Sequence, residues 1–312
     1  MTLSNSRLDT LKRCSRYFKL AYLDGLETVQ GTPALIGNVV HDIVENVLRR
    51  NQMAGLDGDI LFTEEETRRQ IVRLPDDSRH EVTEMMDFWA ENFRIPPDHI
   101  GGIEMELAID WDGNAIELEG QSIRDVEGFR GKLDLVEIYK NSGSIKAIIT
   151  DWKSGWVPPS VDSLETDHQL YRYGLLLLQA FPHVDEIQVK LEFLRLKRTY
   201  PPKHKPLMLD LDILRRETWQ NILDQKANIQ QRIALDKWEP TAGMQCAFCQ
   251  FECPIKNSPA DPKIPTTEED AKLLAGEIVA YESAIAQREM ALHRYLEVVN
   301  PRLQAADRFW SV

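Results

Sequence analysis

The sequence predicts an α/β fold with a mixed sheet flanked by helices. The hydrophobic period changes from helical to extended at about residue 103, and a helical stretch returns at about 163. Between these points lie three consecutive predicted strands, and a fourth strand follows the helix. A meander followed by a crossover helix implies a sheet that mixes antiparallel and parallel pairs. The predicted core therefore runs helix, three strands, helix, strand.

The elements follow from local patterns along the chain. Helices are expected over 4–23, 35–50, 63–93 (broken near Pro75), 163–180, 211–236 and 267–298. Strands are expected at IEMELAID, RGKLDLVEIY, SIKAIITDWK and EIQVKLEFLRLKR. The expected organisation is an N-terminal helical segment 1–34 carrying Cys14, a core 35–210 with a helical insertion at about 55–100, a helix and cysteine segment 211–256, and a linker with a long final helix 257–312.

Composition indicates an ordinary globular chain. The 312 residues carry 37 basic and 50 acidic side chains, so the net charge of −13 disfavours nucleic acid at long range, although a local basic stripe can still bind phosphates. The first residues are polar and charged, unlike a secretory signal. No apolar run approaches the roughly 20 residues that span a membrane. We expect a cytoplasmic protein without membrane contact.

Four cysteines form an uneven pattern, with Cys14 alone and Cys246, Cys249 and Cys253 clustered. In a reducing compartment this pattern favours metal or cluster ligation over disulfides. Four thiolates can hold an iron–sulfur cluster or a tetrahedral zinc ion. Four unligated thiols are the alternative.

Two acids and a lysine lie where two predicted strands can face each other. Asp134 ends Gly131-x-x-Asp134, and Asp151 precedes Lys153 by two residues, so that Asp151 and Lys153 share one strand face. Carboxylates bind Mg²⁺ or Mn²⁺, which polarise a phosphate and activate water. A lysine beside them can orient water or offset developing charge. Each element alone also fits a solvated strand end, but together they favour metal-dependent phosphodiester hydrolysis.

Two further helices carry side chains that suit such a site. His41 is a possible metal ligand, although a lone helical histidine is more often structural. Gln169 and Tyr173 are four residues apart and share a helix face, where they could support the site or simply form a helix edge.

The ordered set His41, Gly131-x-x-Asp134, Asp151-x-Lys153 and Gln169-x-x-x-Tyr173 resembles the RecB-type branch of the PD-(D/E)XK nucleases. With Cys14 and Cys246-x-x-Cys249-x-x-x-Cys253 the chain is similar to the iron–sulfur members, which include the AddB nuclease domain and the CRISPR-adaptation and phage exonucleases. The resemblance covers about residues 1–256 and implies a restriction-endonuclease-like αβββαβ core. One departure is the gap before Cys253, which has three residues where family members usually have five.

The resemblance also implies roles. His41, Asp134 and Asp151 would bind Mg²⁺ or Mn²⁺ with the backbone carbonyl of Trp152, and Lys153 would position the attacking water. Gln169 and Tyr173 would support the site. Glu106 falls where the family often has an acid, with Glu104 competing for the position. Cys14, Cys246, Cys249 and Cys253 would bind a 4Fe–4S cluster, or Zn²⁺ as the alternative, and would tie the N-terminal helix to the segment after the core.

DNA is the expected partner. The candidate contacts are Arg7, Arg13, Arg16, Lys190, Arg195, Lys197 and Arg198, while Trp152 and Tyr200 are candidates for base stacking. The leading hypothesis is an exonuclease or flap-type endonuclease acting on single-stranded or end-accessible DNA in repair, recombination, phage replication or CRISPR adaptation. The alternatives are a non-catalytic cysteine-cluster DNA-binding subunit of a helicase–nuclease and a structural metalloprotein. No G-x-x-x-x-G-K-[ST] motif is present, so unwinding would need a helicase partner.

Overall fold

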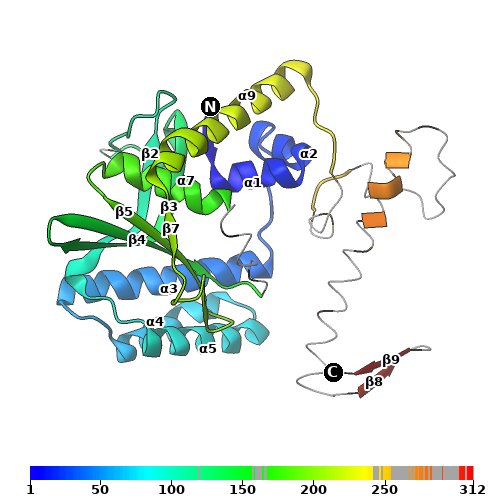
Figure 1. Ribbon diagram of the computed structural model, residues 1–312. Helices are drawn as coiled ribbons and strands as arrows, with labels where there is room; N and C mark the ends of the chain where they lie inside the picture. Colours follow the sequence, from blue (N-terminus) through cyan, green and yellow to red (C-terminus); the bar gives the residue numbers. More distant parts are fainter. Residues whose placement is uncertain are drawn as a thin grey trace. The chain divides into compact units, whose positions relative to one another are not determined.

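The protein is described by a computed structural model (Figure 1). It describes residues 1–118, 120–156, 158, 164, 167–241, 246, 249–253, 267, 269, 271–272, 274–276, 278–279, 282, 290, 302–305 and 308–311. Contacts within the chain define two compact units, 1–5 with 30–231, and 6–29 with 232–312. Most of the predicted linker and long final helix, 257–298, lies outside the described residues.

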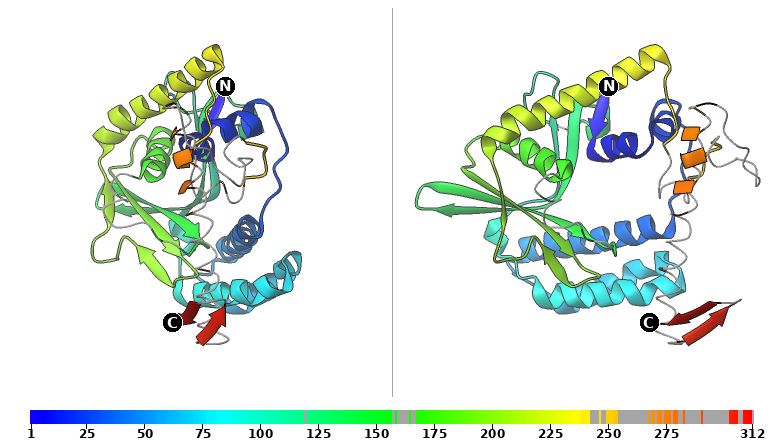
Figure 2. Two further views of the ribbon diagram at one scale, coloured as in Figure 1. Left: turned by 90° about the vertical axis from the view of Figure 1, so that its right-hand side faces the viewer. Right: turned by 45° about the vertical axis from the view of Figure 1, so that its right-hand side comes forward.

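A seven-stranded mixed sheet forms the centre of the first unit (Figures 1 and 2). Its strands follow the order β1-β3-β4-β5-β6, with β2 paired to β3 and β7 paired to β5. The β1·β3 and β4·β5 pairs are parallel and the others antiparallel. The strands are β1 (Thr2–Ser4), β2 (Ile100–Ile109), β3 (Gly128–Asn141), β4 (Ser144–Lys153), β5 (Glu186–Phe193), β6 (Arg198–Tyr200) and β7 (Leu207–Leu209).

Strand β3 is unpaired along part of one edge within the described residues. One of its edges pairs with β2 over residues 129–137. The other edge pairs with β1 over 128–130 and with β4 over 135–141. Among the described strands, none pairs with this second edge over residues 131–134. The sheet is therefore forked at this point.

Helices cover both faces of this sheet. On one face lie α3 (Thr32–Ala54), α4 (Ile60–Gln70) and α5 (Asp76–Asn92), and α7 (His168–Ala180) lies on the other (Figure 2). Apolar residues recur on one side of α3 and are almost fully buried, which gives the helix its packing face. The α3 and α5 residues share a core with Leu135 of β3 and Trp152 of β4. This core packs against one face of the strands and holds them in place, so polar groups at the strand ends have fixed positions.

The remaining elements are short or belong to the second half of the chain. The α8 (Leu211–Ile213), η5 (Leu214–Thr218) and α9 (Trp219–Leu235) segments form one continuous helical stretch, and β8 (Arg302–Ala305) pairs with β9 (Arg308–Ser311). Near the start lie α1 (Asn5–Arg13), α2 (Ser15–Phe18) and η1 (Lys19–Leu23). Single turns occur at η2 (Ile71–Arg73), η3 (Pro97–His99) and η4 (Ile123–Asp125).

The predicted αβββαβ order is confirmed as α3, β2, β3, β4, α7 and β5. The helix expected over 4–23 is interrupted, because Cys14 is extended (φ −160°, ψ 112°) and its sulfur accepts a hydrogen bond from the backbone of Tyr17 as the N-cap of α2. The strand expected to reach Arg198 ends at Phe193, and a turn leads into β6. Strands β1 and β7 were not expected, because three residues are too few to show an alternating pattern.

Within the part of the chain that the structure describes, none of the helices has both the length and the apolar character needed to cross a membrane.

Candidate active site

Asp134 lies in the fork of the sheet. Its Oδ2 accepts a hydrogen bond of 2.8 Å from the backbone N–H of Trp152, a contact that bridges β3 and β4 where their ladder has ended. The Asp134 side chain is almost fully buried. A buried carboxylate held by a backbone donor has a fixed direction, so the fork presents its other oxygen at a defined place.

Asp151 and Lys153 project from the last residues of β4. They alternate with Trp152, whose side chain is buried in the core formed with α3 and α5. The Lys153 ammonium lies 2.6 Å from Oδ2 of Asp151. Burial opposes the charge of Lys153, but the carboxylates of Asp151 and Asp134 outweigh it and raise the pKa of this ammonium. Lys153 is therefore a cation at neutral pH.

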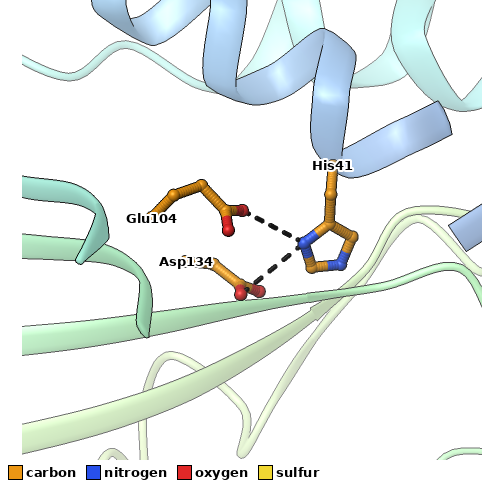
Figure 3. Close-up of side chains that lie close together, drawn as sticks. All are labelled: His41, Glu104 and Asp134. Carbon is orange, nitrogen blue, oxygen red and sulfur yellow. Dashed lines mark hydrogen bonds and ion pairs between the residues drawn. The ribbon is translucent and has the colours of Figure 1, made fainter. Parts of the chain in front are cut away.

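His41 of α3 closes the group from the helical side (Figure 3). Its Nδ1 lies 3.3 Å from Oε1 of Glu104 and 3.6 Å from Oδ1 of Asp134. Its Nε2 lies 3.1 Å from the backbone carbonyl of Trp152. Ligand atoms of His41, Glu104 and Asp134 all lie within 4.8 Å of one another, which is close enough to hold a metal ion.

Glu104, rather than Glu106, occupies this group. Glu106, two residues after Glu104 on β2, is exposed and pairs in register with Lys132. Glu104 has a backbone φ of 48°, a left-handed conformation that is costly for a residue with a side chain. The Lys132 ammonium lies 2.6 Å from Oε2 of Glu104. The family resemblance favours Glu106, with Glu104 competing, and the structure places Glu104 next to His41 and Asp134.

Negative charge dominates the group. Burial lowers the pKa of His41, but its hydrogen bond to Glu104 and the charges of Asp134, Glu104 and Asp151 outweigh this and raise it to about 9. Burial and the nearby Asp151 raise the pKa of Asp134 to about 7. A buried carboxylate such as Asp134, whose ionisation is opposed by burial and by a neighbouring acid, favours a divalent cation, which would offset both effects.

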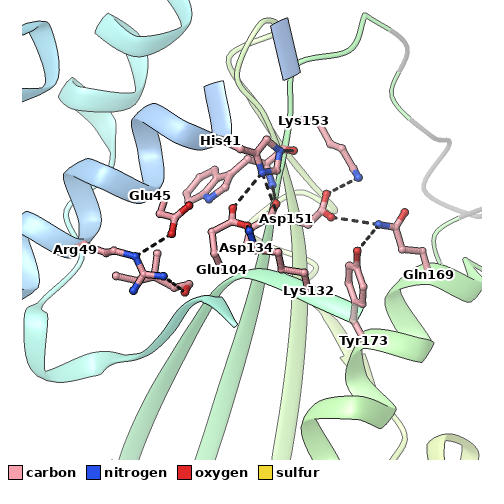
Figure 4. A network of polar contacts seen from close by, with 12 residues as sticks. His41, Glu45, Arg49, Glu104, Lys132, Asp134, Asp151, Lys153, Gln169 and Tyr173 are labelled. Atoms are coloured by element: carbon pink, nitrogen blue, oxygen red, sulfur yellow. Dashed lines mark hydrogen bonds and ion pairs between the residues drawn. The ribbon is translucent and has the colours of Figure 1, made fainter. Parts of the chain in front are cut away.

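Gln169 and Tyr173 of α7 lie beside Asp151 (Figure 4). The amide Nε2 of Gln169 donates to Oδ1 of Asp151 at 3.3 Å and to the Tyr173 hydroxyl at 3.1 Å. Burial, followed by the charges of Asp151 and Asp134, raises the pKa of Tyr173, so its hydroxyl stays protonated. Gly131 permits this approach, because a Cβ there would lie 2.6 Å from Leu176 and 3.2 Å from the Tyr173 ring.

Removal of the Gln169 amide should slow catalysis without unfolding the protein. In Gln169→Ala, Asp151 loses a donor that fixes its direction, and we expect cleavage to fall about 10- to 100-fold, the usual cost of losing a group that orients a metal ligand. Single-turnover cleavage with saturating metal measures it. Gln188→Ala on β5 is the control, and equal rates for Gln169→Ala and the unchanged protein would contradict the assignment.

The residues expected to contact DNA fall into two groups. Lys197, Arg198 and Arg13 are exposed, whereas Arg7 lies against the Tyr22 ring. Two others are engaged internally. Lys190 lies 3.5 Å from Glu137 and 3.9 Å from Glu192, and Arg195 is paired with Glu81 and only 7% exposed. Both cations are thus paired with acids of the protein, and contact with phosphate stays a prediction for them. The Arg16 Nε is buried.

The two aromatic residues expected to stack on bases, Trp152 and Tyr200, both pack against other aromatic rings of the protein. Trp152 is 2% exposed and packs edge-on against Trp89 and Phe93, so its ring is unavailable to a base. Tyr200 packs edge-on against Phe193. Among the residues that the structure describes, Trp156 is an aromatic that lies three residues after Lys153 and is 51% exposed, and no periodic signal in the sequence distinguished it.

The four cysteines belong to the second unit. The Cys14 sulfur accepts a 3.5 Å contact from the backbone N–H of Thr241, and the Cys246 sulfur lies 3.9 Å from the carbonyl of that same residue. The Tyr17 ring lies 4.9 Å from that of Phe251, between Cys249 and Cys253 in sequence. The remote cysteine is thereby brought to the clustered ones.

The forked sheet brings acids, a lysine and a histidine together, a set of groups that can hold a divalent cation and serve phosphodiester hydrolysis. Residues 2–253 match the family model of the PD-(D/E)XK nuclease superfamily, and the chain belongs to this superfamily. It is accordingly a nuclease. Nucleases of this superfamily use divalent metal ions, which the group of His41, Glu104 and Asp134 could hold.

A crystal structure from Eubacterium rectale, described as a candidate exonuclease, is similar to this chain. It has 12% sequence identity and a TM-score of 0.44, over 86% of this chain and 92% of its own. A comparison with curated proteins finds no match.

Proposed function

We propose that the protein is a Mg²⁺- or Mn²⁺-dependent DNA exonuclease that acts on single-stranded or end-accessible DNA in recombination, repair, phage replication or CRISPR adaptation. The observation that supports this most strongly is a cluster of His41, Glu104 and Asp134. These residues come from three separate elements, their ligand atoms lie within 4.8 Å of one another, and Asp151 and Lys153 lie beside them. Five polar groups drawn together from distant parts of the chain cost desolvation energy, and a bound divalent ion would offset that cost.

In this proposal each residue has a defined task. His41, Glu104, Asp134 and Asp151 hold the metal, with the Trp152 carbonyl beside them. A divalent ion held by these residues would supply polarisation of the scissile phosphate and a lower pKa for a bound water. Lys153, kept cationic by Asp151, orients that water and stabilises the charge that develops on phosphate. Gln169 and Tyr173 hold Asp151 in position.

A panel of labelled DNA substrates tests the proposal. Linear single strands, blunt duplexes, flapped duplexes and closed circles are incubated with Mn²⁺ or Mg²⁺, with and without EDTA. We expect metal-dependent, EDTA-sensitive release of short products from the linear single strands, and intact closed circles. Cleavage that survives EDTA would overturn the metal assignment, and equal cutting of closed circles would overturn the exonuclease assignment.

We further propose that Cys14, Cys246, Cys249 and Cys253 bind a 4Fe–4S cluster, with Zn²⁺ as the alternative. Support comes from Thr241, which contacts both Cys246, five residues away, and Cys14, 227 residues away in the sequence. A cluster that closes so long a loop would remove much chain entropy from the unfolded state. The cysteines would then serve folding and DNA grip rather than bond cleavage.

Replacement of Cys14 should remove this cluster. For Cys14→Ser we expect loss of bound iron or zinc and a lower melting temperature, measured by elemental analysis, the visible thiolate–iron absorbance and thermal unfolding. Ser15→Ala is the matched control, because it removes only the hydrogen bond of 2.8 Å to the Glu239 carbonyl. Full metal content and unchanged melting of Cys14→Ser would contradict the proposal.

A further inference from the structure

We propose that Trp156 is a stacking platform for an unpaired nucleobase next to the scissile phosphate, and that it gives the enzyme a preference for single-stranded or frayed DNA. This inference rests on the proposed nuclease function and deepens it. Three observations support it: Trp156 follows Lys153 closely in the chain, Arg195 packs against its ring, and the ring is exposed to solvent.

The chain places Trp156 beside the reacting groups. Strand β4 ends at Lys153, and only Ser154 and Gly155 separate that lysine from Trp156. The Ser154 carbonyl accepts a hydrogen bond of 2.7 Å from Nε of Arg195, which fixes this short connection. A base held at Trp156 would therefore be one of the nucleotides nearest to a phosphate at Lys153 and Asp151.

Arg195 supports the ring from one side. Its guanidinium lies 4.4 Å from the centre of the Trp156 ring, in a cation–π contact. The guanidinium is itself immobilised, since its side chain is 7% exposed and ion-paired with Glu81. Because Glu81 neutralises it, Arg195 is better suited to positioning the indole than to binding a phosphate.

The solvent exposure of Trp156 would explain a preference for unpaired bases. The residue is 51% exposed although one ring face rests on a buried arginine, whereas Trp89 and Trp152 of the same unit are 3% and 2% exposed. A held indole that remains open to solvent matches the faces of any base and so binds without sequence preference. In a duplex those faces are stacked on neighbouring bases, so only an unpaired base can reach Trp156.

The test compares Trp156→Ala and Trp156→Phe with Trp111→Ala. Trp111 is a matched control because it also stacks on a cation, Lys226, and lies beyond the far end of β2 from Glu104, about 15 Å or more along the strand. The substrates are single-stranded oligonucleotides, intact or with one abasic site placed in turn at each position around the cut. Single-turnover kcat/KM with Mn²⁺ is the readout.

For the unchanged protein we expect one abasic position to lower kcat/KM about 5- to 150-fold, the range for loss of one base–aromatic stack. Trp156→Ala should lose as much on intact DNA and become insensitive to that abasic position, while Trp156→Phe and Trp111→Ala should keep most activity and the sensitivity. Wild-type activity in Trp156→Ala, or abasic sensitivity that persists in it, would overturn the inference.

A second readout separates this inference from the proposed function. Quenching of tryptophan fluorescence by oligo(dT) without metal measures stacking when no bond is cut, and Trp156→Ala should lose that quenching and bind more weakly. If the unchanged protein cleaves no DNA, the proposed function fails, and the quenching alone decides the inference. If it cleaves DNA and both Trp156 variants bind and cut like the unchanged protein, the inference fails and the function stands.

Discussion

Asp151→Asn should abolish metal-dependent cleavage, with a fall in the single-turnover rate of at least about 10³-fold. The Asp151 carboxylate has three proposed tasks: it binds the metal, it pairs with Lys153 at 2.6 Å and it accepts the Gln169 amide at 3.3 Å. An asparagine keeps the shape but removes the charge. The metal then binds more weakly, and the buried Lys153 loses the first of the carboxylates that offset its burial. The measurement is product release from a linear single strand at saturating Mn²⁺.

Asp185→Asn is the matched control for this change. Asp185 precedes β5, and its Oδ2 accepts a hydrogen bond of 2.7 Å from the backbone N–H of Ile145, at the opposite end of β4 from Asp151. The same substitution at this end of the strand should leave cleavage near the wild-type rate. Cleavage by Asp151→Asn within about 10-fold of the unchanged protein would contradict the role of Asp151 in the reaction.

Divalent metal should stabilise the folded protein, and the stabilisation should grow from pH 6 to pH 9. Glu104, Asp134 and Asp151 repel one another without a metal, and a cation bound only by the folded state stabilises it by mass action. At a metal concentration about 100-fold above its Kd, we expect the melting temperature to rise by about 5 °C. Thermal unfolding with Mg²⁺ and with EDTA measures the difference.

The direction of the pH effect follows from two groups. The pKa of Asp134 is raised from 3.8 to about 7, so in the metal-free protein this group lowers stability as the pH rises between these values, and the loss is complete above pH 7. The pKa of His41 is raised to about 9, so it contributes stability that is complete below about 6.5 and is lost as the pH rises through 9. A metal must displace protons from both groups, so it binds better at higher pH.

Asp134→Asn separates metal binding from the remaining causes of stability. We expect this variant to be more stable than the unchanged protein in EDTA at pH 8, because one of the repelling charges has gone, and to show little further stabilisation by Mg²⁺. The control is Asp110→Asn at the far end of β2, which should retain the full metal response. A metal response in Asp134→Asn equal to that of the unchanged protein would argue against a metal at this site.

Much of the fold could be predicted because its elements are long enough to show a period. The strand over 144–153 has the bounds that its apolar middle and charged end predict, and the helices around Pro75 break where proline requires it. Strands β1 and β7 could not be predicted, because each owes its existence to pairing with a distant strand rather than to its own three residues.

The site shows the same division. Asp134, Asp151 and Lys153 could be placed together because a short hairpin joins their strands. Glu104 could not be chosen over Glu106, because residues two apart on a strand share a face and the left-handed backbone of Glu104 leaves no signal in the sequence. Clustered basic residues led to the expectation that Lys190 and Arg195 contact DNA. Their pairs with Glu137 and Glu81 could not be predicted, because these pairs depend on tertiary contacts.

The fork in the sheet has a consequence for the discrimination between metal ions. The Trp152 N–H occupies Oδ2 of Asp134, and Lys132 occupies Oε2 of Glu104, so each carboxylate turns a single oxygen toward His41. Each of these carboxylates would therefore offer one oxygen to a metal ion. Calcium fills its larger shell with bidentate carboxylates, whereas magnesium accepts a few single oxygens and retains its waters. The backbone of one strand and a lysine of another would thus select the smaller ion by limiting denticity rather than by adding ligands.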